Sequence, residues 1–186
     1  MASPVTDDPR YPIGKFHRPD EYTPKLRAQH IQDIAMTPQY MIQALAGLSP
    51  TQLDTPYRDG GWSLRQVAHH VPDSHMNSYI RFKLALTEDN PTIKPYAEDK
   101  WAELKDSQLP VEGSLALLEH MHERWVVLLK SLDEDQWKRS FLHPDNGPMA
   151  LPMAAAIYSW HGKHHVAHIT RLRDQKGWSN FVRPAW

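Results

Sequence analysis

Residues 158–172 read YSWHGKHHVAHITRL, a stretch that sets four histidines among apolar and small residues. An α-helix repeats every 3.6 residues, so side chains four positions apart project from one face, one above the other. His161 and His165 therefore present two imidazole rings on the same face of a predicted helix. Because both rings can reach one metal ion, we interpret these residues as metal ligands.

The remainder of this predicted helix continues the same stripe. Apolar residues and histidines recur every three or four positions, which is the spacing of a core-facing helix surface. A polar group buried without a partner costs about 1–3 kcal/mol, so such a stripe needs hydrogen bonds or a metal ion. The stripe consists of Leu151, Ala154, Tyr158, His161, His165, His168 and Leu172.

A second predicted helix, from Ser63 to about Thr87, has a matching stripe. Ser63 and Gln66 form a capping box at its start, and Pro72 is expected to bend it because proline removes a backbone hydrogen bond. Two polar stripes that face each other predict a pocket, with His70 as a third ligand. The core-facing positions of this helix are Val67, His70, Ser74, Asn77, Arg81 and Leu84.

Two further helical patterns complete a predicted all-α four-helix bundle. Thr23-Pro24 opens the first helix, in which Pro38 predicts a kink or restart with Thr37 as a second N-cap. Residues 114–132 carry apolar positions spaced by three and four, which indicates a purely structural bundle helix. The connections are too long for a minimal design, so we expect the helix order up-down-down-up.

Shorter segments connect these helices. Residues 49–62 are predicted to be a connector, and residues 96–104 a short helix. Residues 141–151 contain Pro144-Asp145-Asn146-Gly147, which predicts a short hairpin or structured turn. Pro152 suits the start of the last helix, and Gly177 suits its C-terminal cap.

The chain is predicted to hold one domain. Residues 1–22 contain several prolines and little periodicity, which favours an extended N-terminal arm to which we assign no chemistry. Residues 23–180 form the metal-binding bundle, and residues 181–186 a C-terminal tail. A chain of 186 residues is long enough to bury a core without disulfides.

Composition restricts the function. The net charge is -1, and the chain has no block of Lys and Arg that would favour nucleic acid or a membrane surface. No apolar run approaches the roughly 20 residues of a membrane span, and the first residues lack the apolar core of a secretory signal. We therefore expect a cytoplasmic protein that binds a small molecule.

The absence of cysteine leaves His, Asp and Glu as the strong metal ligands. Three neutral imidazoles suit one divalent ion such as zinc or nickel, and three protein ligands leave positions open to water or substrate. His168 could in principle supply the fourth ligand of a closed structural site. The alternative to any metal site is a set of core histidines that bond to carbonyls and water.

Three segments resemble the DinB-like superfamily, most closely its YfiT branch of proposed metal-dependent hydrolases. They are WSLRQVAHH at residues 62–70, DSHMNSYIR at residues 73–81, and residues 160–169 with Trp160-His161 and His165-Val166-Ala167-His168-Ile169. The likeness extends from Tyr11-Pro12-Ile13-Gly14 to Gly177-Trp178, which is most of the chain.

This resemblance implies a four-helix bundle, nickel or zinc held by three histidines and completed by waters, and often a homodimer. Carried over by position, the ligands are His70, His161 and His165, the same residues that the helical pattern indicates. His69 and His164 then point away from the metal. His168 becomes a residue of the pocket.

Several reactions fit such a site. A metal on three imidazoles lowers the pKa of bound water toward about 7 and polarises a carbonyl or phosphoryl oxygen, so hydrolysis is the leading interpretation. The superfamily also contains metal-dependent thiol S-transferases and thiol-dependent isomerases, which would use a low-molecular-weight thiol. A protein that only binds a metal or small ligand is the third possibility.

Other residues near the predicted site could take part in the reaction. Asp73, His75 and His168 are candidates for a general base, which the sequence does not rank. Arg81 could bind an anionic part of the substrate, or form a structural ion pair instead. Asn77 could orient the substrate.

Overall fold

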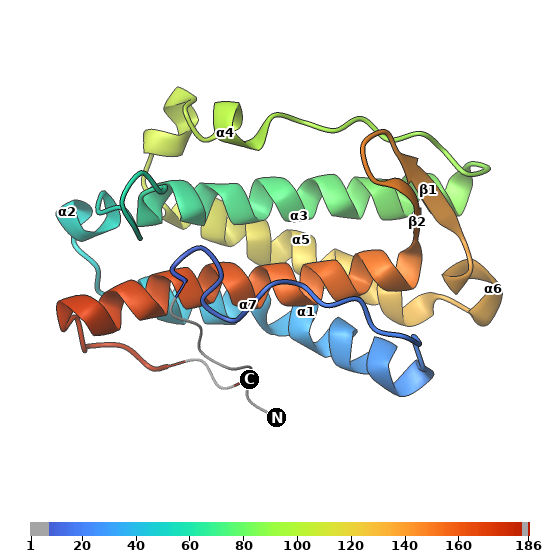
Figure 1. The fold of residues 1–186 in the computed structure, drawn as a ribbon, viewed down its shortest axis with the longest axis horizontal. Helices are drawn as coiled ribbons and strands as arrows, with labels where there is room; N and C mark the ends of the chain where they lie inside the picture. The colour runs from blue at the N-terminus through green and yellow to red at the C-terminus, as the bar shows by residue number, and fades with distance from the viewer. Residues whose placement is uncertain (1–7, 184–185) are drawn as a thin grey trace.

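The computed structural model describes residues 8–183 and residue 186 of the chain. Four long helices, α1, α3, α5 and α7, form a bundle (Figure 1). In this view α1 and α7 run from right to left, whereas α3 and α5 run from left to right. The expected all-α bundle with the order up-down-down-up is confirmed. The helices span Pro24–Leu45 (α1), Leu64–Thr87 (α3), Glu112–Ser131 (α5) and Leu151–Lys176 (α7).

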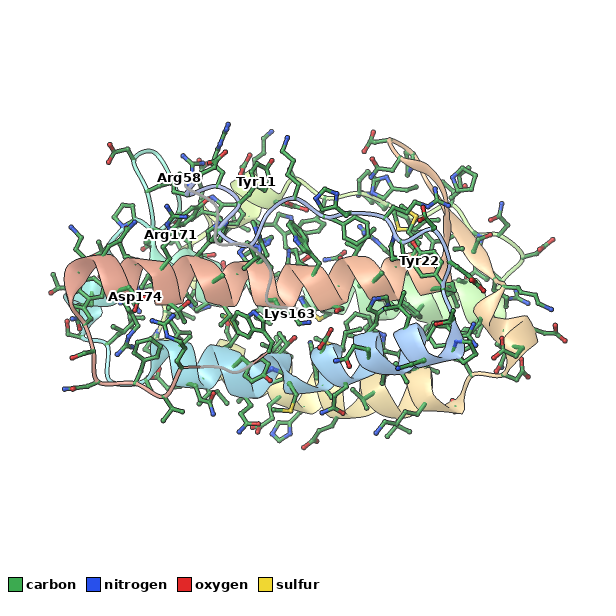
Figure 2. All side chains as sticks on the ribbon, turned by 60° about the horizontal axis from the view of Figure 1, so that its bottom comes forward. Tyr11, Tyr22, Arg58, Lys163, Arg171 and Asp174 are labelled. Atoms are coloured by element: carbon green, nitrogen blue, oxygen red, sulfur yellow. The ribbon has the colours of Figure 1, made fainter. Side chains whose placement is uncertain are left out.

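Each long helix packs against two others. Helix α1 lies against α7 and α5, and α3 lies against α5 and α7. The neighbours α1 and α7 are parallel, as are α3 and α5, while the other two pairs are antiparallel. Lys163 points from α7 toward α1 (Figure 2), and its Nζ lies 2.6 Å from Oδ2 of the buried Asp33.

The helix ends agree with the capping signals. Thr23 Oγ1 accepts from the Leu26 amide at 3.2 Å, and Ser63 exchanges two hydrogen bonds with Gln66 at 3.1 and 3.0 Å. Gly177 ends α7 with φ of 68°, the left-handed conformation that glycine adopts without strain.

The prediction of a restart at Pro38 is wrong. Helix α1 is continuous through this proline, and the Thr37 hydroxyl donates to the Asp33 carbonyl at 3.0 Å instead of capping a new helix. Helix α3 likewise continues through Pro72. Each proline lacks an N–H, so the carbonyls of Ile34 and Ala68 lose their partners in the helix ladder.

Short elements occupy the connections. The predicted hairpin is confirmed as an antiparallel pair of strands, and the short helix expected within residues 96–104 is α4. Three short helices of the described residues were not predicted, and two of them begin with a capping box, Ser49 with Gln52 and Asp133 with Gln136. The short elements are α2 (Pro50–Leu53), α4 (Glu98–Trp101), the 3-10 helix η1 (Lys105–Gln108), α6 (Glu134–Trp137), β1 (Ser140–His143) and β2 (Gly147–Ala150).

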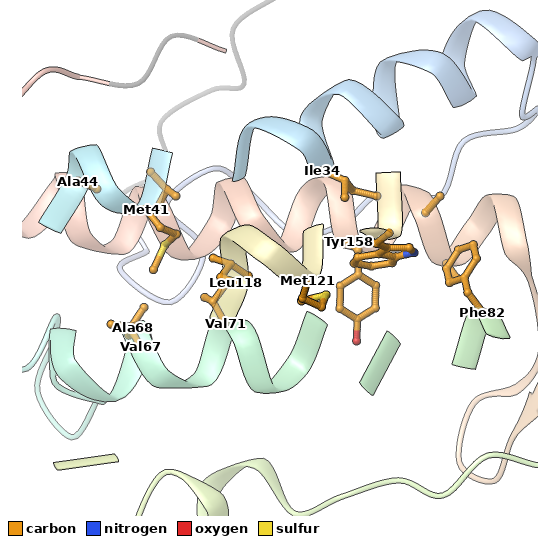
Figure 3. Packing of buried hydrophobic residues seen from close by; sticks show 14 of the residues in the cluster. Ile34, Met41, Ala44, Val67, Ala68, Val71, Phe82, Leu118, Met121 and Tyr158 are labelled. Atoms are coloured by element: carbon orange, nitrogen blue, oxygen red, sulfur yellow. The ribbon is translucent and has the colours of Figure 1, made fainter. Parts of the chain in front are cut away.

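The core lies between the four long helices. All four contribute buried apolar side chains, which meet in the bundle interior as Figure 3 shows. The core includes Ile34 and Met41 from α1, Val67, Val71 and Phe82 from α3, Leu118, Met121 and Trp125 from α5, and Tyr158 and Ile169 from α7.

The predicted N-terminal arm contains no helix or strand from residue 8 onward and follows α7. The Trp160 indole donates to the Gly14 carbonyl at 3.2 Å, and Phe16 packs edge-on against the same indole at 6.2 Å between centroids. Residues 1–7 of the arm and residues 184–185 of the tail lie outside the described residues. Within residues 8–183, no helix combines the length and apolar character that crossing a bilayer requires.

Helices α1 and α7 approach closely at Gly162. A Cβ atom at this position would lie 2.8 Å from Thr37 Cγ2 and closer still to Thr37 Oγ1. Thr37 is 1% exposed, so neighbouring atoms leave it little room to shift. We expect Gly162→Ala to lower the free energy of unfolding by about 1–3 kcal/mol, measured by urea unfolding, because overpacking outweighs the gain in helix propensity.

A second substitution distinguishes this clash from a general effect of alanine. Adding Thr37→Ala to Gly162→Ala should restore part of the stability. Gly113→Ala in α5 is the matched control, because its Cβ would meet no atom within 4 Å. It should stabilise the protein by up to about 1 kcal/mol, and a Gly162→Ala variant as stable as this control would contradict the close approach.

Candidate metal centre

Three histidines predicted to be ligands meet between α3 and α7. His161 Nε2 lies 3.3 Å from His70 Nε2 and 3.2 Å from His165 Nε2. One ligand nitrogen from each of the three residues lies within 4.8 Å of the other two. The structure thus brings His70, His161 and His165 together as one cluster, which we call the histidine triad.

Local helix geometry explains this arrangement. His161 and His165 are one turn apart on α7, so their rings lie on one face and meet edge to face at 4.4 Å between centroids. Helix α3 runs antiparallel to α7 and presents His70 to that face. Trp62, just before α3, packs on the His70 ring at 4.6 Å between centroids and covers it.

The spacing fits a divalent ion. Two nitrogens that each lie 2.0–2.1 Å from a tetrahedral zinc ion are about 3.3 Å apart, by the geometry of the tetrahedron. The contacts of 3.3 and 3.2 Å that His161 makes in the triad match this separation. The donor set, three imidazoles with no thiolate, suits zinc or nickel.

Burial keeps the triad neutral. It lowers the pKa of His70 to about 4, with a smaller effect from His164, and lowers the pKa values of His161 and His165 well below 6.5. Neutral imidazoles are the form that binds metal, so no proton has to leave these rings at pH 7 before an ion can bind.

A second set of histidines lies behind the triad. His161 Nδ1 is 3.1 Å from His75 Nε2, and His75 Nδ1 is 2.9 Å from His122 Nε2. His122 Nδ1 donates to the Ile34 carbonyl at 2.7 Å. His75, one of the candidate bases, therefore has both ring nitrogens engaged inside the core.

A cavity of about 540 Å³ opens beside the triad. His165 belongs to both the triad and the cavity wall. Arg58 also lines the cavity, and its Nε is buried without a hydrogen-bond partner among the residues that the structure describes. The wall is formed by Tyr57, Arg58, Gly60, Gly61, Trp62, Gln66, Asp99, Glu103, His164, His165 and His168.

The other two histidines of α7 shape this wall. The His168 ring stacks on Tyr57 at 4.0 Å between centroids, and its Nε2 donates to the Arg10 carbonyl at 3.3 Å. His164 lies outside the triad, as expected, but it does not turn to solvent. It is 7% exposed and stacks on Trp160 at 4.3 Å between centroids.

The remaining predicted site residues lie elsewhere on α3. Burial and the nearby Asp106 raise the pKa of Asp73 to about 6, but Asp73 is not part of the cavity wall. The Asn77 amide donates to the Asp73 carbonyl of its own helix at 2.9 Å. Arg81 is also absent from this wall, because it lies about four turns beyond Gln66, the residue of α3 that lines the cavity.

Sequence reasoning missed several residues at this centre. Arg58 lies in a connector, and Asp99 and Glu103 lie in and just after the one-turn helix α4, which is too short for periodicity to mark a functional side chain. The helix at residues 114–132, predicted to be purely structural, also carries His122, which bonds to His75 behind the triad. A signal existed: Leu118, His122, Trp125 and Leu129 are spaced by four, three and four, and all are buried.

Comparison with known proteins identifies the family of this chain. The DinB superfamily profile matches residues 33–169. The chain belongs to the DinB superfamily. It is 56% identical over 172 residues to a Bacillus cereus protein named "putative metal-dependent hydrolase", an alignment that covers 92% of this chain and 99% of that protein. The resemblance drawn from the sequence is confirmed.

Two solved structures share the fold. YfiT from Bacillus subtilis, described as "a probable metal-dependent hydrolase with an unusual four-helix bundle topology", has a TM-score of 0.89 and 49% identity, over 92% of this chain and 99% of its own. A mycothiol-dependent maleylpyruvate isomerase has a TM-score of 0.63 and 16% identity, over 77% of this chain and 60% of its own. The second likeness shows the fold alone.

Acid should destabilise the metal-free protein. Unfolded histidines titrate near pH 6.5, whereas burial lowers the pKa values of His70, His122 and His164 to about 4. The unfolded chain therefore binds more protons between these values, and the free energy of unfolding falls as the pH decreases from about 6.5 to about 4. The difference corresponds to about 3 kcal/mol per histidine at full titration.

Urea unfolding in the presence of a chelator, at several pH values from about 7 to about 5, measures this loss. Asp73 acts in the opposite direction because its pKa is raised, but it is one group against several. His122→Gln removes one buried imidazole, so the free energy of unfolding should depend less on pH, by the contribution of that one histidine. A stability that stays constant over this range would show that the histidines are not buried in the neutral form.

Proposed function

We propose that this DinB-superfamily protein is a metal-dependent hydrolase of a small molecule, with one zinc or nickel ion held by His70, His161 and His165. The observation that carries the proposal is the convergence of three neutral imidazoles beside a cavity. The names of the B. cereus relative and of YfiT support the same reaction class.

The ion would supply an activated water and polarise the bond to be cleaved. The protein would contribute position and shielding. Three ligands from two packed helices hold the site rigidly, and Trp62 and the stacked rings of Tyr57 and His168 keep bulk water from one side.

The cavity wall supplies groups for substrate binding. Arg58 has a buried Nε without a partner in residues 8–183, and an anionic oxygen of the substrate could satisfy it. Asp99 and Glu103 are exposed on the same wall and could bind a positive or donor group. Since Arg81 and Asn77 do not line this cavity, we propose Arg58 in place of Arg81 as the anchor for an anionic group.

The ligand assignment predicts the metal content of variants. His70→Ala, His161→Ala and His165→Ala should each lose nearly all bound metal, because two imidazoles give too few ligands to hold the ion. Elemental analysis of the purified proteins measures this loss.

His164→Ala is the matched control for these variants. It removes an equally buried imidazole from the same helix, but one outside the triad, so its metal content should equal that of the wild type. Retention of metal in any of the three triad variants would remove that residue from the ligand set. Loss in the control would place the metal on a different face of α7.

A substrate screen tests the reaction class. Metal-loaded protein should hydrolyse members of an ester, amide and lactone panel without added thiol, and His161→Ala should lower kcat/KM by more than about 100-fold. Arg58→Gln should raise KM for anionic substrates with little change in kcat. Turnover that requires a low-molecular-weight thiol would replace the hydrolase with a transferase or isomerase, and metal binding without turnover would indicate a binding protein.

A further inference from the structure

Three hydrogen bonds connect a backbone carbonyl of α1 to the histidine triad. They run from the Ile34 carbonyl to His122 at 2.7 Å, from His122 to His75 at 2.9 Å, and from His75 to His161 at 3.1 Å. We call His122, His75 and His161 the histidine chain. From the Ile34 carbonyl on α1, the histidine chain crosses the bundle through α5 and α3 to α7.

Pro38 explains why the histidine chain is anchored at the Ile34 carbonyl. In a regular helix the carbonyl of residue 34 accepts from the amide of residue 38, but proline has no N–H. Helix α1 nevertheless continues through Pro38, so the Ile34 carbonyl faces the core without its usual donor. His122 supplies that donor from the neighbouring helix.

The carbonyl sets the direction of every bond in the chain. It can only accept, so His122 carries its hydrogen on Nδ1, and its Nε2 must accept from His75 Nδ1 because a neutral ring has one hydrogen. His75 Nε2 then accepts from His161 Nδ1. His161 Nε2 is left with a lone pair, and this is the atom that faces His70 and His165.

Among the described residues, the surroundings of His75 and His122 offer their ring nitrogens no other hydrogen-bond partner. His75 is 0% and His122 is 1% exposed, so water does not reach these rings. Trp125 packs edge-on against both, at 5.9 Å from His75 and 5.6 Å from His122 between centroids, and Tyr158 packs edge-on against His75 at 4.9 Å. In the part of the chain that the structure describes, no carboxylate bonds to any of the three rings.

We propose that His122 and His75 are positioning residues that hold His161 in the Nδ1–H tautomer, so that its Nε2 lone pair is ready for a metal ion before one binds. This inference rests on the proposed metal site and explains how one of its ligands is oriented. Metal-binding histidines commonly donate their second nitrogen to a carboxylate or carbonyl. Here two neutral rings transmit the same constraint from a carbonyl without adding a charge.

Nitrogen-15 NMR of the imidazoles in the metal-free protein tests the tautomers directly. Wild-type protein should show hydrogen on Nδ1 and none on Nε2 in all three rings of the chain. His122→Phe removes the acceptor for His75, so His75 and His161 should shift toward the Nε2–H tautomer. Zinc binding, measured by competition with a chelator, should weaken about 10- to 100-fold.

His122→Gln is the rescue variant. Its amide can donate to the Ile34 carbonyl and accept from His75 at once, so the tautomers and most of the zinc affinity should return. His30→Phe, which removes another buried imidazole outside the chain, should leave both unchanged.

Two results would overturn the proposal. One is an Nε2–H signal from His161 in metal-free wild-type protein. The other is a folded His122→Phe variant with wild-type tautomers and zinc affinity. Because the tautomers are read without metal or substrate, failure of the hydrolase assignment would leave this test intact.

Discussion

The burial of imidazole rings is the constraint on which this structure depends. A ring nitrogen enclosed in a bundle needs a partner, since each unsatisfied group costs about 1–3 kcal/mol. The histidine chain meets this requirement by starting from a carbonyl that Pro38 leaves free and by passing one hydrogen bond from ring to ring. The direction of these bonds leaves the Nε2 lone pair of His161 facing the triad, so the hydrogen bonds that satisfy the buried rings would also orient this proposed ligand.

The helix order makes this possible. Because α3 lies antiparallel beside α7, His70 faces the pair of histidines on α7. The long connection over residues 88–111 returns the chain so that α5 runs parallel to α3, which brings His122 beside His75. The same connection carries Asp99 and Glu103 to the cavity wall. A simple up-down order would give α5 the opposite direction and separate these groups.

The outer side of the site depends on segments that are not part of the bundle. The arm contributes the Arg10 carbonyl to His168 and the Gly14 carbonyl to Trp160, so backbone atoms fix the rings that border the cavity. Tyr11 of the arm and Arg58 of the connector lie on the same side of α7 (Figure 2). Irregular segments thus decide the shape of the cavity beside the triad, while the helices decide the position of the triad.

The sequence by itself determined the four long helices, their caps and the three histidines of the triad, because each depends on periodicity or on contacts within a few residues. Only the tertiary structure decided which carbonyl anchors the core, since His122 and Ile34 are brought together by the packing of α5 on α1. The tertiary structure also decided that Arg58, Asp99 and Glu103 line the cavity, whereas the sequence predicts Asn77 and Arg81. The position of the cavity along α3 and the path of long loops depend on contacts between distant residues, which helical spacing does not contain.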